Sequence, residues 1–258
     1  MATVREIESV LYDWAPKELA ASWDNVGLLV GDPEAGVKTV LVALDITQQV
    51  VEEAVELGAE LIVAHHPVMN CAWHPVQTLR EDDHLGKKLR TLIRGNISAI
   101  CMHTNLDAAE GGVNDVLAEK LGLTEISPLG EDGIGRIGVL NEEKNLAEYT
   151  SFVVKSLGCH GARVRDGGKY VCKVAVGGGA CGSYISAAKS KGCDTFVTSD
   201  LKYNDFLDTE GLNLIDAGHF PTENVICPVI AERLSKAFAD LNVVVSASHK
   251  EAMEYYMN

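Results

Sequence analysis

Apolar residues recur along the chain with two spacings, which predict alternating strands and helices. Short continuous apolar runs are typical of buried strands, and apolar residues at every third or fourth position are typical of amphipathic helices. The expected strands are 40–44, 61–64, 97–102, 134–140, 171–176, 195–198 and 212–215, and the expected helices are 3–14, 48–57, 85–94, 113–121, 146–157 and 184–191. Strands joined through a helix pair in parallel, so the order predicts an α/β fold with largely parallel sheets.

The order of these elements repeats in the second half of the chain. The strand, helix, glycine and strand of 40–64 are matched by the same succession in 171–198. Residues 103–121 can also be laid over 216–234 without a gap, so that LAEKL meets IAERL. A repeated order of elements together with repeated letters indicates an internal duplication.

Composition and charge exclude several classes of protein. The chain has 258 residues and a net charge of −15, which argues against binding nucleic acid or anionic membranes because both need a basic surface. No apolar run approaches the roughly 18 residues of a membrane span, and the N-terminus lacks the apolar stretch of a signal peptide. Seven cysteines without a CxxC pair favour reduced thiols. We therefore expect a cytoplasmic protein.

The stretch LIVAHHPVMN places two histidines directly after an apolar strand. His65 and His66 follow the run 61–64, and Pro67 ends the element. Ligands gather at the carboxyl ends of strands in open α/β sheets, so both imidazoles are candidate functional groups. In the alternative interpretation, one histidine caps a turn and the other is a core residue. The loop 68–83 that follows contains Trp73 and His74 and is long enough to be functional.

Two later strands also end in polar clusters. His103 and Asp107 follow the strand 97–102, although Asp107 could instead cap the next helix. His219 and Glu223 follow the strand 212–215. Because Pro221 lies between them, we expect these two to project from a loop and the start of a helix, not from one regular helix.

Imidazole nitrogens and carboxylate oxygens without thiolates are suited to zinc, iron, manganese, cobalt or nickel. Five such ligands exceed the three that usually hold a single catalytic zinc, whereas two metals about 3.5 to 4 Å apart would use five or six. The candidate ligands are His65, His66, Asp107, His219 and Glu223.

A competing pattern lies at Gly177, Gly179 and Gly182. This GxGxxG follows a strand, precedes a helix and is followed by Asp200, as in dinucleotide-binding folds. Nicotinamide binding or a phosphate contact at the helix start are therefore alternatives. The third interpretation is a tight turn in which glycines permit close packing.

Four motifs in order across most of the chain resemble the GTP cyclohydrolase type 2 homologues, also called the NGG-one-interacting factor three-like family. They are SWDNVGLLVGDP, the HHP of LIVAHHPVMN, HTNLDAAEGGVND and GHFPTE. The resemblance implies an α/β fold of two similar, intimately packed lobes, 1–125 and 126–258, with a dinuclear metal site between them and a toroidal hexamer. The family's ligands fall on His65, His66, Asp107, His219 and Glu223, and a site-lining histidine falls on His103.

Two features depart from the family pattern. The chain has no room for the domain that longer members insert between the lobes. The tail 246–250, SASHK, lacks the Asp-Thr-Asp-Pro-like ending of many members.

Three functions fit these observations. The first is a metal-dependent hydrolase of a nucleotide or related heterocycle, in which His103 moves protons. The second is a non-catalytic metallochaperone or metal-insertion factor, and the third is a regulatory module that acts through protein contacts. Two divalent metal ions per chain are the expected cofactors.

Overall fold

The computed structural model describes residues 1–71 and 75–256, and the chain divides into two compact units. The first unit consists of Met1–Ala109 and Ile226–Lys250. The second unit consists of Glu110–Val225 and the chain from Glu251 onward. Trp73 and His74, in the loop expected to be functional, lie outside the described residues.

The unit boundaries differ from the expected boundary at residue 125. Helix α5 (Val113–Lys120) packs on strand β8 (Arg136–Lys144), and so it belongs to the second unit. Helix α10 (Ile226–Ala237) and strand β13 (Asn242–Val245) belong to the first unit, where β13 pairs in parallel with β4. Contacts between segments far apart in sequence decide both assignments, and the order of elements does not reveal them.

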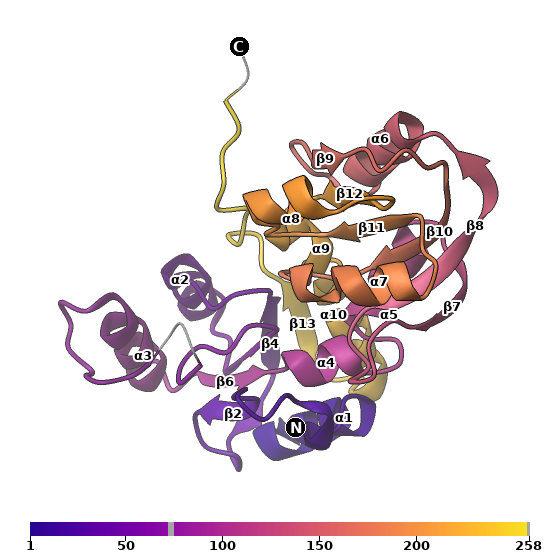
Figure 1. Ribbon diagram of the computed structural model, residues 1–258. Coiled ribbons are helices and arrows are strands. Elements are labelled where there is room, and N and C mark those ends of the chain that lie inside the picture. The colour runs from indigo at the N-terminus through magenta and orange to yellow at the C-terminus, as the bar shows by residue number, and fades with distance from the viewer. Residues whose placement is uncertain (72–74, 257–258) are drawn as a thin grey trace. The chain divides into compact units, whose positions relative to one another are not determined.

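The first unit is built on a five-stranded sheet of order β13-β4-β5-β6-β2. Neighbouring strands are parallel except for β2, which pairs antiparallel with β6. All four residues of β5 are buried, as expected of a central strand. The elements of the first unit are β1 (Ala2–Thr3), α1 (Val4–Trp14), a 3-10 turn (Lys17–Leu19), β2 (Gly27–Val30), β3 (Gly36–Val37), β4 (Thr39–Ala43), α2 (Gln48–Leu57), β5 (Leu61–Ala64), α3 (His84–Arg94), β6 (Ser98–Cys101), α4 (Thr104–Ala108), α10 and β13 (Figure 1).

The second unit is built on a six-stranded sheet of order β7-β8-β10-β11-β12-β9. Its central strands β10, β11 and β12 are parallel, while β8 and β9 run antiparallel beside them. Its elements are α5, β7 (Thr124–Pro128), β8, α6 (Leu146–Leu157), β9 (Arg163–Arg165), β10 (Val171–Val176), a 3-10 turn (Gly182–Tyr184), α7 (Ile185–Ser190), β11 (Thr195–Thr198), α8 (Tyr203–Asp208), β12 (Asn213–Asp216) and α9 (His219–Glu223) (Figure 1).

The two sheets repeat the same core. In each, three parallel strands follow one another in sequence order, β4-β5-β6 and β10-β11-β12, with an antiparallel strand beside the third. The first two strands of each set are connected through a helix, α2 or α7. This architecture confirms the predicted α/β class with mixed, largely parallel sheets flanked by helices.

Local sequence signals account for several helix ends. Thr3 caps α1 in a reciprocal capping box with Glu6. Helix α2 ends at Gly58, whose positive φ of 62° is readily adopted only by a residue without a side chain.

The expectation for Pro221 is wrong. His219 and Glu223 both lie on the short helix α9, four residues apart. Pro221 is tolerated because it occupies the first turn, where the backbone N–H groups have no acceptor within the helix. This helix therefore presents both candidate ligands.

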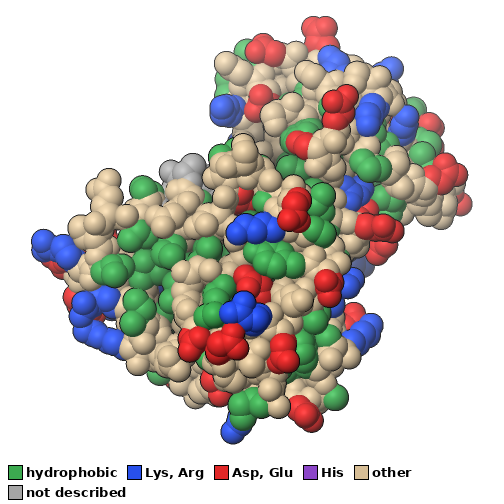
Figure 2. Space-filling model, turned by 90° about the horizontal axis from the view of Figure 1, so that it is seen from below, with side chains coloured by type: hydrophobic (Ala, Val, Ile, Leu, Met, Phe, Trp, Pro, Cys, Tyr) green, Lys and Arg blue, Asp and Glu red, His purple; other side chains and the backbone are tan. Residues whose placement is uncertain are grey.

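The described surface carries charges of both signs. On the face seen in Figure 2, acidic and basic side chains lie side by side among hydrophobic ones, in keeping with the absence of a strongly basic composition. Among the described residues, none of the helices has the length and apolar character needed to span a membrane.

Candidate metal centre

Two adjacent parallel strands of the first unit bring three histidines together. His65 and His66 follow β5, while His103 follows β6, and parallel neighbours end at the same edge of a sheet. The ring centroid of His65 lies 5.0 Å from that of His66 and 5.2 Å from that of His103, and the centroids of His66 and His103 are 5.5 Å apart. One ligand atom from each ring lies within 4.8 Å of the others, a spacing that could hold a metal ion.

Asp107 joins this cluster from α4. Its Oδ1 lies 3.6 Å from Nε2 of His65, and both side chains are buried or nearly so. Asp107 lies within α4, and the N-cap of the next helix, α5, is Gly112, so the capping interpretation does not hold. The structure therefore brings four of the six predicted site residues together within one unit.

Each of the three histidines is held through Nδ1. Nδ1 of His65 lies 2.7 Å from the carbonyl oxygen of Met102, Nδ1 of His66 lies 2.8 Å from Oδ1 of Asp45, and Nδ1 of His103 lies 2.9 Å from the Asp24 carboxylate. Carbonyl and carboxylate oxygens only accept hydrogen bonds, so the hydrogen must be on Nδ1 in each ring. Nε2 is then the nitrogen that each ring presents as a ligand, which is the arrangement that orients histidines on metals.

Asp24 and Asp45 remain ionised in these contacts. Burial alone would raise the pKa of Asp24, but hydrogen bonds from His103 and Thr104 outweigh it and hold the pKa well below its usual range. Burial likewise opposes ionisation of Asp45, and hydrogen bonds from His249 and His66 again lower its pKa. Two fixed negative charges behind the imidazoles favour a cation in front of them.

The second unit carries a smaller cluster on α9. Nδ1 of His219 lies 2.6 Å from Oδ2 of Asp200, and its Nε2 lies 2.9 Å from Oε2 of Glu223. Burial alone would lower the pKa of His219, but the two carboxylates raise it to about 11. In the metal-free protein the ring therefore carries a proton, and a metal cation would satisfy the same pair of negative charges.

The glycine-rich turn packs closely against this cluster and leaves room for the Glu223 carboxylate. Gly179 has a φ of +64°, and a Cβ at this position would lie 2.0 Å from Oε1 of Glu223. The amide of Gly178 donates to Asn114, and that of Gly179 donates to Thr222. Protein side chains thus occupy the amides that a phosphate would need, which favours the tight-turn interpretation over a dinucleotide site.

Asp200 also has a different role from that of a ribose-binding acid, because it anchors His219. Asp24, Asp45 and Asp200 contact the candidate histidines, and the sequence does not assign any of the three to the metal site. Asp45 and Asp200 had an available signal, since each closely follows an apolar strand, as the predicted ligands do.

The donor set fits a divalent metal of intermediate hardness. The atoms offered are imidazole nitrogens and carboxylate oxygens. Cys101 ends β6 close to the cluster, but burial raises the pKa of its thiol to about 12, so it stays protonated at neutral pH. Buried His, Asp and Glu groups of this chain could therefore hold a metal ion without thiolate ligands.

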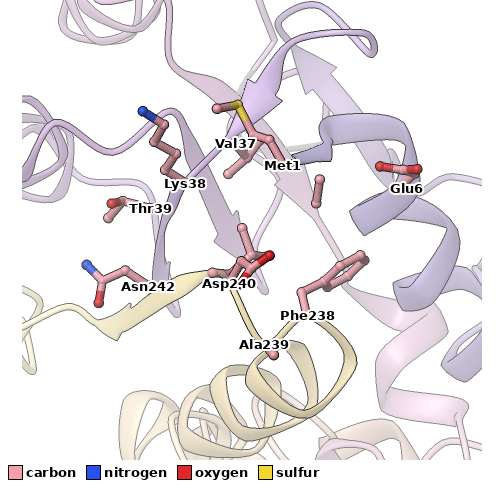
Figure 3. A pocket seen from close by; sticks show the side chains of 11 residues that line it. Met1, Glu6, Val37, Lys38, Thr39, Phe238, Ala239, Asp240 and Asn242 are labelled. Carbon is pink, nitrogen blue, oxygen red and sulfur yellow. The ribbon is translucent and has the colours of Figure 1, made fainter.

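A separate hollow of about 650 Å³ lies in the first unit, and it is lined by other residues. Figure 3 shows its side chains, which come from the N-terminal segment, from 37–39 and from 238–242. None of the predicted site residues lines this hollow, so it is not part of the candidate metal centre.

Comparison with known proteins agrees with the resemblance seen in the motifs. The chain is 35% identical to a Clostridium perfringens protein named GTP cyclohydrolase 1 type 2 homolog, over 98% of this chain and 99% of that protein. A Bacillus cereus protein related to NIF3 has a similar structure, with a TM-score of 0.92 and 27% identity over 99% of each chain.

Reduced HcgD from Methanocaldococcus jannaschii is also similar, with a TM-score of 0.82 and 30% identity over 95% of this chain and 97% of its own. The model of the Duf34/NIF3 (NGG1p interacting factor 3) family matches residues 2–252. This chain therefore belongs to the Duf34/NIF3 family.

Proposed function

We propose that this protein is a metal-dependent hydrolase with a dinuclear centre, acting on a nucleotide or a related heterocycle. The proposed ligands are His65, His66, Asp107, His219 and Glu223. The observation that carries the proposal is the anchoring of His65 and His66 through Nδ1, because it orients Nε2 of both rings for a cation before any cation binds.

The electrostatics of the second cluster support the same proposal. Asp200 and Glu223 place two carboxylates on one imidazole, which is more negative charge than a single protonated ring neutralises. A divalent cation is a suitable partner for such a group. The name of the curated relatives, GTP cyclohydrolase 1 type 2 homolog, suggests the substrate class.

Divalent ions would supply Lewis acidity and would make water a nucleophile at neutral pH. The chain's own residues would handle the proton. With its Nδ1 hydrogen donated to Asp24, His103 can accept a proton at Nε2, and the ionised Asp24 stabilises the imidazolium that forms. We propose that His103 acts in this way as general base and then as general acid.

Metal analysis and turnover test the proposal together. Protein purified without added metal should contain up to two divalent ions per chain, and wild type should hydrolyse at least one member of a panel of nucleotides and cyclic amides. The variant His65→Ala should lose both metal and activity, whereas His84→Ala, which alters an exposed histidine of α3, should keep both.

The outcomes separate the candidate functions. Activity that survives in His65→Ala would overturn the hydrolase. Stoichiometric metal that exchanges readily, with no turnover on the panel, would instead indicate a metal-handling protein. A wild-type protein that cannot be loaded with two ions per chain would overturn the dinuclear centre.

A further inference from the structure

The C-terminal tail of the first unit is fastened to helix α2. After β13, the tail 246–250 runs past Glu53, whose carboxylate accepts hydrogen bonds from Ser246 Oγ, Ala247 N, Ser248 N and Ser248 Oγ. Burial alone would raise the pKa of Glu53, but these four donors lower it. A tail of small polar residues is usually mobile, so the four bonds mark it as an ordered part of the unit.

The attachment of the tail to Glu53 places His249 beside Asp45. The imidazole of His249 is only 8% exposed, and its Nε2 lies 3.0 Å from Oδ2 of Asp45. The backbone amide of Asp45 lies 2.9 Å from the same nitrogen. Either tautomer of His249 therefore binds Asp45, through the carboxylate or through the backbone.

Asp45 connects this contact to His66. While Oδ2 faces His249, Oδ1 lies 2.8 Å from Nδ1 of His66. The Asp45 side chain is 39% exposed, so with one partner its carboxylate could rotate toward water. When Nε2 of His249 carries the hydrogen, each carboxylate oxygen of Asp45 has a partner, both side-chain torsions of Asp45 are restrained, and the His66 ring is held in one orientation.

We propose that His249 is a positioning residue for metal binding, which makes the C-terminal tail part of the metal centre. The inference rests on the proposed function only in taking His66 as a ligand. His249 does not touch the metal; it restrains Asp45, and Asp45 restrains His66. Outer partners of this kind change metal affinity by about 10-fold to 100-fold when they are removed.

The test is metal affinity, measured by competition with a chelator for Zn²⁺ and by the absorption spectrum of the Co²⁺ form. His249→Ala should weaken the affinity by about tenfold and change the Co²⁺ spectrum, because His66 is no longer held in one orientation. His249→Gln should restore most of the affinity, because its side-chain amide can donate to Asp45 from a similar position. Asp45→Ala serves as the reference for a full loss of the restraint, because it removes both carboxylate oxygens.

Two controls separate positioning from stability. His84→Ala should leave the affinity unchanged, because His84 is exposed on α3. Glu53→Ala removes the fastening of the tail while keeping His249, and it should show an intermediate loss of affinity. The melting temperature of each metal-free variant reports stability independently of metal.

Affinity in His249→Ala within twofold of wild type would overturn the inference. The inference would also be overturned if the loss of metal affinity were proportional to the decrease in the metal-free melting temperature across all variants and His249→Gln restored no affinity. If wild type binds metal tightly but His249→Ala is unaffected, only the role of the tail fails. If wild type binds no metal, the proposed function fails with it.

Discussion

At the scale of single residues, histidines paired with carboxylates recur among the candidate site residues of each unit. His66, His103 and His219 each place Nδ1 against an aspartate, namely Asp45, Asp24 and Asp200. Such a partner determines the tautomer, increases the basicity of Nε2 and restrains the ring. Because both units contain such pairs, we infer that the aspartates serve to orient the histidine rings.

The first prediction concerns His66 itself. His66→Ala should reduce divalent metal affinity by at least about 100-fold, because it removes a ligand and not only its outer partner. The metal-free melting temperature should fall by only a few degrees, since the buried strand core of β5 is untouched. Chelator competition and thermal denaturation measure the two effects. Global unfolding of the metal-free variant would show instead that His66 is structural.

The second prediction concerns Gly179. Gly179→Ala should displace the Glu223 carboxylate, because its Cβ would lie 2.0 Å from Oε1, and metal affinity should fall about tenfold or more. Gly192→Ala is the matched control: Gly192 has a φ of +72°, but no atom lies within 4 Å of its Cβ position.

Both substitutions impose the cost of a positive φ, about 1 kcal/mol of unfolding free energy. Only Gly179→Ala should also change metal affinity, as measured by calorimetric titration. Equal affinity in the two variants would show that the glycine turn does not shape the Glu223 site.

At the scale of elements, the candidate ligands of each unit lie at strand ends and on very short helices. α4 and α9 each have five residues, too few for an isolated helix to be stable. Each is held in place because it directly follows a buried strand, β6 or β12. The strands of the two sheets therefore determine where the candidate ligands of each unit lie.

The third prediction concerns the attachment of the tail to α2 and its pH dependence. The pKa of Glu53 is held below its usual value of 4.5, so its contribution to stability is present above the pKa of the unfolded chain and disappears as pH falls through the folded pKa. Glu53→Gln should lower the unfolding free energy by about 1 kcal/mol at pH 7, a value limited by solvent exposure.

The difference between Glu53→Gln and wild type should shrink toward zero as pH falls through the lowered pKa of folded Glu53, because the wild-type carboxylate is then protonated as well. Urea denaturation of the metal-free proteins at several pH values measures this difference. Glu56→Gln, an exposed position on the same helix, should show no comparable effect. A difference that persists in acid would contradict the assignment to the ionised carboxylate.

At the scale of the whole molecule, the chain is two α/β units whose sequences are interleaved. The second unit begins at Glu110, but the chain returns to the first unit at Ile226 to add α10 and β13. Cutting the chain at residue 125 would therefore separate elements that pack together. Each unit depends on segments from both halves of the sequence.

The fourth prediction is the assembly state. We expect a hexamer, as the family resemblance implies, with a mass in solution about six times the chain mass of 27.7 kDa. Size-exclusion chromatography with light scattering measures it, with and without added metal. A stable monomer or dimer at micromolar concentration in both conditions would contradict the expectation.

The sequence alone determined the α/β class, most strands and helices, and the three polar clusters at strand ends. These are local properties, since hydrophobic spacing and capping residues act over a few positions, as Thr3 with Glu6 and Gly58 show. The ordered motifs were also sufficient to identify the family. The sequence does not place the candidate ligands His219 and Glu223 on one helix, because a proline inside a helix is disfavoured except in its first turn, where Pro221 lies.

Only the tertiary structure decided which side chains meet. Asp24 and His103 are 79 residues apart, and Asp45 and His249 are 204 apart. Sheet register and chain crossings bring such pairs together, and neither can be read from local spacing. For the same reason, the tail that ends the first unit could not be connected to His66 from its sequence.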